Sequence, residues 1–275
     1  MIVRLFCPVC ALAATKKLPF AEIEVPVPIA HISDDGRYDV RCQAGHVSIV
    51  FLDNLKFELL FETGLNALMD KYPREAVSSF ASSLERFYEF YWQVAMAQLS
   101  ISEPEKASAW KAIAKQSERQ LGAFITAHLL LMKKTPALLN PNNEVKLRND
   151  VIHGGYVPKS EEAAVFGNSV MRLINGALDD LRRSIPDVLK ATYKALSPAP
   201  KDSKDDELLG IVNICTAVDV RHPIHKEGQA HIGSVEDHFE RILRDRQPHG
   251  MQLLSEEEMK KRFPDANILK RRKQE

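Results

Sequence analysis

Residues 148–155 read RNDVIHGG. Arg148 is a permanent cation, and its guanidinium can donate two parallel hydrogen bonds to a phosphate. His153 titrates near neutral pH, so its ring can accept or donate a proton. A pair of glycines is typical of a helix end, and we therefore expect a helix that ends just after His153. The stretch predicts both a helix terminus and a site suited to phosphate chemistry.

The spacing within this stretch distributes its polar groups over two sides of the expected helix. Asn149 and His153 are four residues apart and share one face. Arg148 and His153 are five residues apart, which at about 3.6 residues per turn leaves them well separated in angle. The long Arg148 side chain can reach around the helix, but the geometry within one chain is not ideal. We therefore expect a second copy of the chain to complete the site.

The stretch from Arg148 to His153 resembles the Arg-x4-6-His signature of the HEPN superfamily, in its Arg-Asn-x3-His form. The similarity continues through RNDVIHGGYVPKSEEA, residues 148–163, and covers roughly residues 55–189. The resemblance implies a small all-α bundle that forms dimers in which two motifs face each other. It implies one of two functions. Many such proteins are ribonucleases of toxin–antitoxin, abortive-infection or other phage-defence systems, and others only bind nucleotides or RNA.

The resemblance also implies roles for individual residues. His153 would act as general base or acid on the ribose 2′-OH or the leaving 5′-oxygen, Arg148 would stabilise the transition state, and Asn149 would orient the phosphate or the His. Glu85 matches an acidic position that faces the motif. No catalytic metal is implied. The alternative is structural, because a His near a helix C-terminus is stabilised by roughly 0.3–1 kcal/mol, and Glu85 would then be an ordinary solvated residue.

The charge balance excludes a basic surface over the whole molecule. The chain has 275 residues with 37 Lys and Arg against 37 Asp and Glu, so any surface that binds RNA has to be local. No apolar run reaches the roughly 18 residues of a membrane-spanning helix. The first residues lack a basic segment followed by an apolar core, so we expect no signal peptide. These features predict a cytoplasmic protein with no membrane partner.

Three of the four cysteines lie near the start of the chain, in a pattern typical of a metal site rather than of disulfides. Cys7 and Cys10 form a Cys-x2-Cys pair, and Cys42 and His46 form a Cys-x3-His pair in which Gly45 suits a tight turn. Together they offer the four ligands that a structural zinc ion needs. The expected strands of this zinc ribbon are residues 21–27, 38–41 and 47–52, with a turn at residues 34–36.

Two alternatives to zinc remain open at this point, a redox-active cysteine pair and two buried thiols. A redox pair normally begins a helix, and Pro19, Pro26 and Pro28 argue against a helix soon after Cys10. A zinc site closed by four protein ligands is structural and does no chemistry. The only basic cluster in this segment is Lys16-Lys17. We therefore expect the ribbon to serve as a scaffold or to recognise a partner, in preference to binding nucleic acid.

From residue 55 the apolar residues recur with helical spacing. The second expected helix is long and rich in aromatic residues, most of which we expect to form the core. We expect His128 to be a surface or core residue without a catalytic role. The motif helix should begin at Asn140-Pro141, and Pro186 should interrupt or end the last helix. About six helices with short loops predict a bundle; they cover residues 55–72, 75–100, 103–115, 121–134, 141–153 and 160–185.

The last part of the chain is mixed in character. A polar linker precedes residues 208–220, an apolar run that should form one strand and join the N-terminal sheet. Within that run Cys215 is expected to be a buried thiol. His222 and His225 have metal-ligand spacing, but no carboxylate or Cys accompanies them, so a solvated loop is the favoured interpretation. Short helices are expected at residues 234–246 and 255–263. The basic tail, residues 270–273, would attract RNA or simply remain in solvent.

These features predict a mainly α fold with three parts. Residues 1–53 form a small β zinc ribbon, residues 54–196 a HEPN-like helical bundle, and residues 197–275 a mixed extension. The expected function is a metal-independent endoribonuclease that acts on RNA as a homodimer, with structural zinc as its cofactor. The alternative is a non-catalytic module that binds a nucleotide, RNA or a protein partner. An antitoxin or an assembly scaffold is a third hypothesis.

Overall fold

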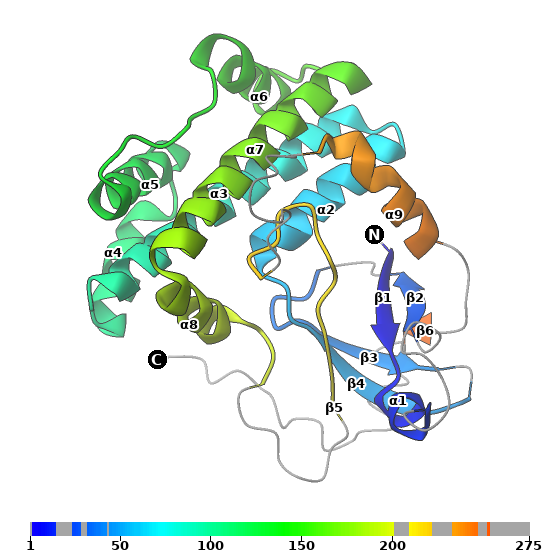
Figure 1. Ribbon diagram of the computed structural model, residues 1–275. Helices are drawn as coiled ribbons and strands as arrows, with labels where there is room; N and C mark the ends of the chain where they lie inside the picture. The colour runs from blue at the N-terminus through cyan, green and yellow to red at the C-terminus, as the bar shows by residue number, and fades with distance from the viewer. Residues whose placement is uncertain are drawn as a thin grey trace. The chain divides into compact units, whose positions relative to one another are not determined.

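The computed structural model describes residues 2–14, 24–28, 32–42, 44–200, 209–221, 233–246 and 252–253. The fold is mainly helical with a small sheet near the N-terminus, as predicted (Figure 1). The chain divides into two compact units. The first comprises Met1–Asp53, Pro198–Ile214 and Arg244–Glu275, and the second comprises Asn54–Ser197 and Cys215–Leu243. Residues 197–275 therefore do not form a unit of their own, because both units contain parts of them.

The first unit is built from short strands and one helix. Its elements are β1 (Ile2–Phe6), α1 (Pro8–Ala14), β2 (Glu24–Pro28), β3 (Arg37–Arg41), β4 (Val47–Leu52), β5 (Leu209–Val212) and β6 (Gln252–Leu253). β1 pairs with β2, and the remaining strands form a second sheet in the order β5-β4-β3-β6. β3 and β4 form an antiparallel hairpin, and β5 pairs with β4 in parallel.

The expected turn at residues 34–36 leads directly into β3. Gly36 has a φ of +65°, and a Cβ there would lie 2.7 Å from the carbonyl oxygen of Leu52, so both the backbone angle and the space favour glycine. β5 joins the N-terminal sheet, as predicted for the run at residues 208–220. The strand is much shorter than predicted and ends at Val212. The residues beyond it pack in the helical unit instead, where Ala217 and Val218 are buried.

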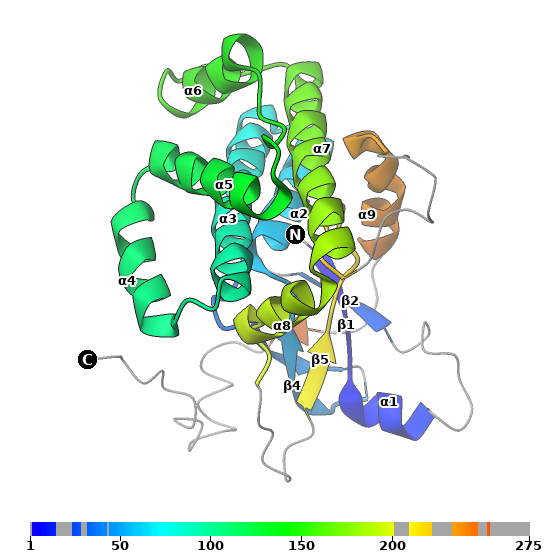
Figure 2. The ribbon, with the colours of Figure 1, turned by 60° about the vertical axis from the view of Figure 1, so that its left-hand side comes forward.

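The second unit is a helical bundle. Its elements are α2 (Lys56–Met69), α3 (Pro73–Gln98), α4 (Glu103–Ile113), α5 (Ser117–Met132), the π-helix η2 (Pro141–Val145), α6 (Lys146–Ile152), α7 (Ser160–Ser184), α8 (Pro186–Leu196), the 3-10 helix η3 (Val235–His238) and α9 (Phe239–Asp245). α3 packs against α2, α5 and α7, and Figures 1 and 2 show it running through the middle of these helices.

The core of the bundle forms around aromatic residues of α3, as predicted. Phe80, Phe87 and Tyr91 are fully buried. The ring of Phe80 lies against two glycines, Gly64 of α2 and Gly167 of α7, where an added Cβ would come within 2.5 Å and 2.7 Å of the ring. Both helices therefore approach α3 closely at this level, which gives the two glycines a packing role.

Pro186 does not simply end the last bundle helix. α7 ends at Ser184, and Pro186 occupies the start of a further helix, α8, that the sequence prediction lacked. Proline suits the first position of a helix because its missing N–H has no intrahelical acceptor there and its φ is already helical. Leu189 and Tyr193 are buried residues of α8.

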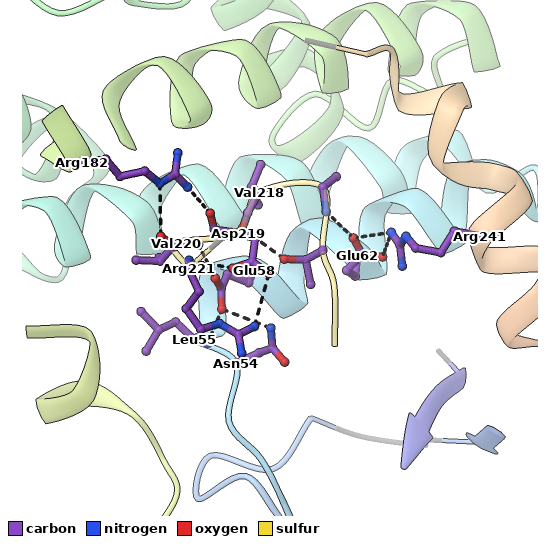
Figure 3. A network of polar contacts seen from close by, with 12 residues as sticks. Asn54, Leu55, Glu58, Glu62, Arg182, Val218, Asp219, Val220, Arg221 and Arg241 are labelled. Carbon is purple, nitrogen blue, oxygen red and sulfur yellow. Dashed lines mark hydrogen bonds and ion pairs between the residues drawn. The ribbon is translucent and has the colours of Figure 1, made fainter. Parts of the chain in front are cut away.

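Two buried carboxylates on α2 fasten the segment at residues 217–220 to the bundle (Figure 3). Glu58 accepts hydrogen bonds from the backbone N–H of Leu55 at 2.8 Å and of Val220 at 2.9 Å. Glu62 accepts one from the backbone N–H of Ala217 at 2.8 Å and is paired with Arg241 of α9 at 2.8 Å. The backbone N–H groups of Ala217 and Val220 therefore bond to carboxyl groups and not to a neighbouring strand. These hydrogen bonds hold the segment in place without making it a strand.

The stability of the protein should fall as pH rises because of Glu58. Burial and the charge of Asp219 raise its pKa from 4.5 to about 8, against the opposing effect of the N–H donors of Val220 and Leu55. The folded state then binds more protons than the unfolded state between those two pKa values, so ionisation costs stability across this window. We expect a loss of roughly 2–5 kcal/mol between pH 5 and pH 8.5.

Urea unfolding at the two pH values measures this effect. Glu58→Gln should flatten the dependence whatever its effect on absolute stability, because the titrating group is gone. Glu105→Gln, an exposed position on α4, should keep the wild-type slope. An unchanged slope in Glu58→Gln would show that Glu58 does not titrate in this range.

Candidate functional site

The predicted motif lies on a short helix that follows a π-helix. Asn140 caps η2, since its Oδ1 accepts hydrogen bonds from the backbone N–H groups of Asn142 at 2.9 Å and Asn143 at 3.3 Å. η2 continues directly into α6, so the predicted single helix over residues 141–153 begins with a wider turn. Such turns change the direction of the side chains that follow, and they are frequent at functional sites. Val151, which is fully buried, anchors α6 to the bundle.

Three of the predicted site residues meet. The Nη2 of Arg148 contacts Oε1 of Glu85 on α3 at 2.5 Å, and its Nη1 donates to Oδ1 of Asn149 at 2.9 Å. The Arg148 and Glu85 side chains are 19% and 29% exposed, so the ion pair is partly shielded from water. The guanidinium is therefore held by two acceptors, one of them from a helix distant in the sequence.

His153 lies apart from this group. It is the C-terminal cap of α6 and is exposed, and its backbone N–H donates to the Asn149 carbonyl at 2.9 Å. In the part of the chain that the structure describes, no hydrogen bond joins its ring to another side chain. The chain leaves the helix through Gly154 and Gly155, as predicted, and Gly155 has a φ of +70°.

A pocket of about 340 Å³ adjoins the motif. Glu85, Arg148 and Asn149 are among its lining residues, and His153 is not. Most of the lining is apolar. The paired guanidinium is therefore part of the lining of a small, largely apolar cavity.

Four side chains of the first unit cluster as a possible metal-binding site. Cys7 and Cys10 lie between β1 and the first turn of α1, and Cys42 and His46 lie in the loop of the β3–β4 hairpin. Their ligand atoms are all within 4.8 Å of one another. Nδ1 of His46 is 3.3 Å from Sγ of Cys10 and 3.5 Å from Sγ of Cys42, and those two sulfurs are 3.7 Å apart.

These distances match the edges of a tetrahedron of zinc ligands. Bond lengths of about 2.3 Å to sulfur and about 2.0–2.1 Å to nitrogen require edges of about 3.8 Å between sulfurs and about 3.6 Å between sulfur and nitrogen. The arrangement is thus compatible with a structural zinc ion bound by three thiolates and one imidazole.

The backbone of the hairpin loop supports the cluster. Gly45 has a φ of +81°, as expected for the tight turn, and its N–H donates to the Cys42 carbonyl at 2.9 Å. Ser48, which the sequence prediction lacked, places its Oγ 3.7 Å from Sγ of Cys7. Burial opposes ionisation of the Cys7 thiol, but hydrogen bonds from the Cys10 backbone and from Ser48 outweigh it and lower its pKa.

Two predictions about cysteines are wrong. A helix, α1, does follow Cys7, because the prolines invoked against it lie further along the chain and Pro8 suits a first helical turn. The redox interpretation still loses support, since β1 pairs antiparallel with β2 and two further ligands converge on the cysteines. Cys215 is exposed and not buried, because the strand that was to enclose it ends at Val212.

The remaining predicted features divide into two groups. His128 is buried and structural, with Nδ1 3.0 Å from the Lys134 carbonyl oxygen and its ring stacked on Tyr91. Several predictions lie outside the described residues, namely those for Lys16-Lys17, His222, His225, the helix at residues 255–263 and the basic tail at residues 270–273.

Over the described residues, no helix combines the length and apolar character needed to cross a membrane. Comparison of the chain with protein-family models, with curated proteins and with solved structures finds no match.

Proposed function

We propose that this chain is a metal-independent endoribonuclease of the HEPN type, which acts on RNA as a homodimer and carries a structural zinc in its first unit. The observation that carries the proposal is the ion pair that brings Glu85 of α3 to Arg148, beside Asn149 and a pocket. Sequence resemblance alone matched Glu85 to a position that faces the motif. The setting that the resemblance suggests is a toxin–antitoxin or phage-defence system.

The proposed reaction needs two functions from the chain, a general base and a donor that stabilises developing negative charge. His153 removes the proton of a ribose 2′-OH, whose oxygen attacks the adjacent phosphorus atom. Arg148 donates hydrogen bonds to the phosphate oxygens as their negative charge develops. The bond to the 5′-oxygen breaks, that oxygen takes up a proton from water, and the protonated His153 gives its proton to the hydroxide that remains. The products are a 2′,3′-cyclic phosphate and a 5′-hydroxyl end, and no metal takes part in any step.

Glu85 is proposed as a positioning residue. A guanidinium has five N–H donors in a fixed plane, and the contacts to Glu85 and Asn149 use two of them. The remaining donors are available for a phosphate. The pairing also has a cost, because the carboxylate offsets the positive charge that would attract RNA.

That cost supports the second candidate, a bundle that binds a nucleotide, RNA or protein without cleaving it. In one chain the Arg148 cation is neutralised by Glu85, and His153 lies apart from both. A catalytic site therefore depends on a second copy that supplies the missing group.

The surface next to the motif supports such a dimer. Tyr156, Val157 and Val165 are 42%, 65% and 60% exposed, and they follow the motif at the start of α7 and in the preceding loop. Exposed apolar side chains that follow the motif in the sequence offer surface that a second subunit would cover. A two-fold contact through this surface would bring the two motifs together.

We expect the protein to have twice the 31.0 kDa mass of the chain in light scattering at micromolar concentration. Replacing both Val157 and Val165 with Glu should yield a monomer and reduce cleavage, because four charges would face one another across the axis. Leu99→Glu, at an exposed position after α3, should remain dimeric. A wild-type protein that is strictly monomeric at this concentration would contradict the proposal.

The substrate test uses RNA and DNA of the same sequence, incubated with the protein for times short enough to leave the structural zinc in place. RNA should be cut in the presence of EDTA, and DNA should not, because it lacks the 2′-OH. A single 2′-deoxy substitution at the cut site should block cleavage there. Cleavage of DNA, or cleavage that EDTA abolishes at once, would rule out this mechanism.

A further inference from the structure

The pocket beside Arg148 has the size and lining of a small-molecule site. Its volume of about 340 Å³ lies near the lower end of the range for ligand pockets, roughly 300–1,000 Å³. Side chains of α3, α5, α6, η2 and α7 line it, all of them in the second unit. The walls are mainly apolar and include Leu84, Leu121 and Phe166. Such walls suit a flat, uncharged ring.

One polar group in this lining, the hydroxyl of Tyr88, has no hydrogen-bond partner among the described residues. Tyr88 is only 6% exposed, and its ring stacks on Phe124 with the centroids 4.7 Å apart. Within the described residues, nothing forms a hydrogen bond with its hydroxyl group. Burial and the charge of Glu85 raise the pKa of Tyr88, so the hydroxyl remains protonated at neutral pH. Tyr88 lines the pocket, so a ligand there can form a hydrogen bond with its hydroxyl group.

The charges around the pocket decide which part of a ligand enters it. Glu118, at the start of α5, is exposed and has no ion pair among the residues described. Glu85 is paired with Arg148, so the lining carries two carboxylates against one guanidinium. The excess of negative charge disfavours a phosphate inside the pocket. It favours a neutral group that offers N–H donors, because an ionised carboxylate can only accept hydrogen bonds.

We propose that this pocket holds a guanine base of the RNA, next to the phosphate that Arg148 binds. Guanine is the one common base whose Watson–Crick edge presents two adjacent donors, N1–H and the N2 amino group, which match the two oxygens of a carboxylate. Adenine and cytosine place an acceptor beside their amino group, and uracil places its single N–H between two carbonyls. Glu118 is the carboxylate free to read this edge, and Tyr88 supplies a further hydrogen bond. The role of the bound base in cleavage rests on the proposed ribonuclease function. The binding of guanine to the pocket does not.

Calorimetric titration of the full chain with the 3′-monophosphates of guanosine, adenosine, cytidine and uridine tests the assignment. Guanosine 3′-monophosphate should bind at least about tenfold more tightly than the others. Glu118→Gln should remove most of this preference, because the amide replaces one acceptor with a donor. Tyr88→Phe should weaken guanosine binding severalfold. Leu121→Trp should fill the cavity and abolish binding, and Glu105→Gln, exposed on α4, should bind like the wild type. Binding is compared only among variants whose melting temperature equals that of the wild type.

Equal binding of the four nucleotides, or wild-type preference in Glu118→Gln, would overturn the inference. A second assay separates it from the proposed function, using RNAs that carry G, A, C or U beside one cut site. Cleavage without base preference, together with no guanosine binding, would reject the guanine pocket and keep the ribonuclease. Selective guanosine binding without any RNA cleavage would keep the pocket and reject the ribonuclease.

Discussion

Cys42→Ser is expected to release the metal ion from the first unit and to unfold that unit. Cys42 and His46 supply the two ligands of the hairpin loop, and a hydroxyl is a poor substitute for a thiolate on zinc. Structural zinc contributes an apparent folding free energy of about 10–16 kcal/mol in small zinc domains at neutral pH. The strands of this unit are short, two to six residues each, so their own core offers little compensation.

Metal analysis and limited proteolysis measure this effect together. The wild type, purified without chelators, should contain one zinc ion per chain, and Cys42→Ser should contain almost none and be cut rapidly within residues 1–53. Cys215→Ser is the matched control, because Cys215 is exposed and outside the cluster. It should retain both the metal and the resistance to protease. A freshly purified wild type without zinc would end the zinc assignment.

Arg148→Ala and His153→Ala are each expected to remove most RNA cleavage. Loss of a preorganised donor to a developing charge typically costs about 10²–10³ in rate, and loss of a general acid or base costs about 10²–10⁴. The two residues act on one transition state, so the double variant should be only slightly slower than the poorer single variant. Initial rates on a labelled RNA provide the measurement.

Arg74→Ala is the matched control for this pair, since Arg74 lies at the start of α3 with its side chain 43% exposed. It should cut RNA at the wild-type rate. Single variants whose effects multiply fully in the double variant would contradict the proposal that Arg148 and His153 form one site.

The long helices could be predicted from the sequence because the apolar residues that stabilise them recur at helical spacing. α3 buries its aromatic residues at helical spacing, and its observed bounds differ from the predicted range by about two residues at each end. The β3–β4 hairpin and the metal ligands could be predicted for a similar reason. The two ligands of each pair are only a few residues apart, so a single turn of the backbone brings them together. These are local features, and each depends on residues near one another in the sequence.

Features that depend on distant partners could not be predicted in this way. Residues 217–220 have the composition of a strand, yet their backbone groups bond to Glu58 and Glu62 of α2 (Figure 3). Nothing near those residues in the sequence signals this alternative. The exposure of Cys215 has the same origin, because it follows from where β5 ends. The sequence predicts that Pro186 interrupts or ends the last helix, but the further helix α8 is not predicted, since it depends on the packing of Leu189 and Tyr193.

The candidate site shows the same division. Arg148, Asn149 and His153 belong to one short motif, but Glu85 is 63 residues from Arg148, and only the family resemblance connected them. The π-helix before the motif leaves no recognisable mark on the sequence. Tyr88 has the spacing of a core aromatic residue, and its ring is indeed buried. Its unpaired hydroxyl becomes evident only once the pocket is formed.

The most direct test of the central claim is one RNA cleavage measurement on the wild type and on the Arg148→Ala, His153→Ala double variant, with EDTA present and with the product ends identified. The claim predicts that the wild type cuts RNA and leaves 2′,3′-cyclic phosphate ends, and that the double variant is slower by at least about 10³. Equal rates for the two proteins would contradict it, and the motif would then be a structural helix end in a binding module.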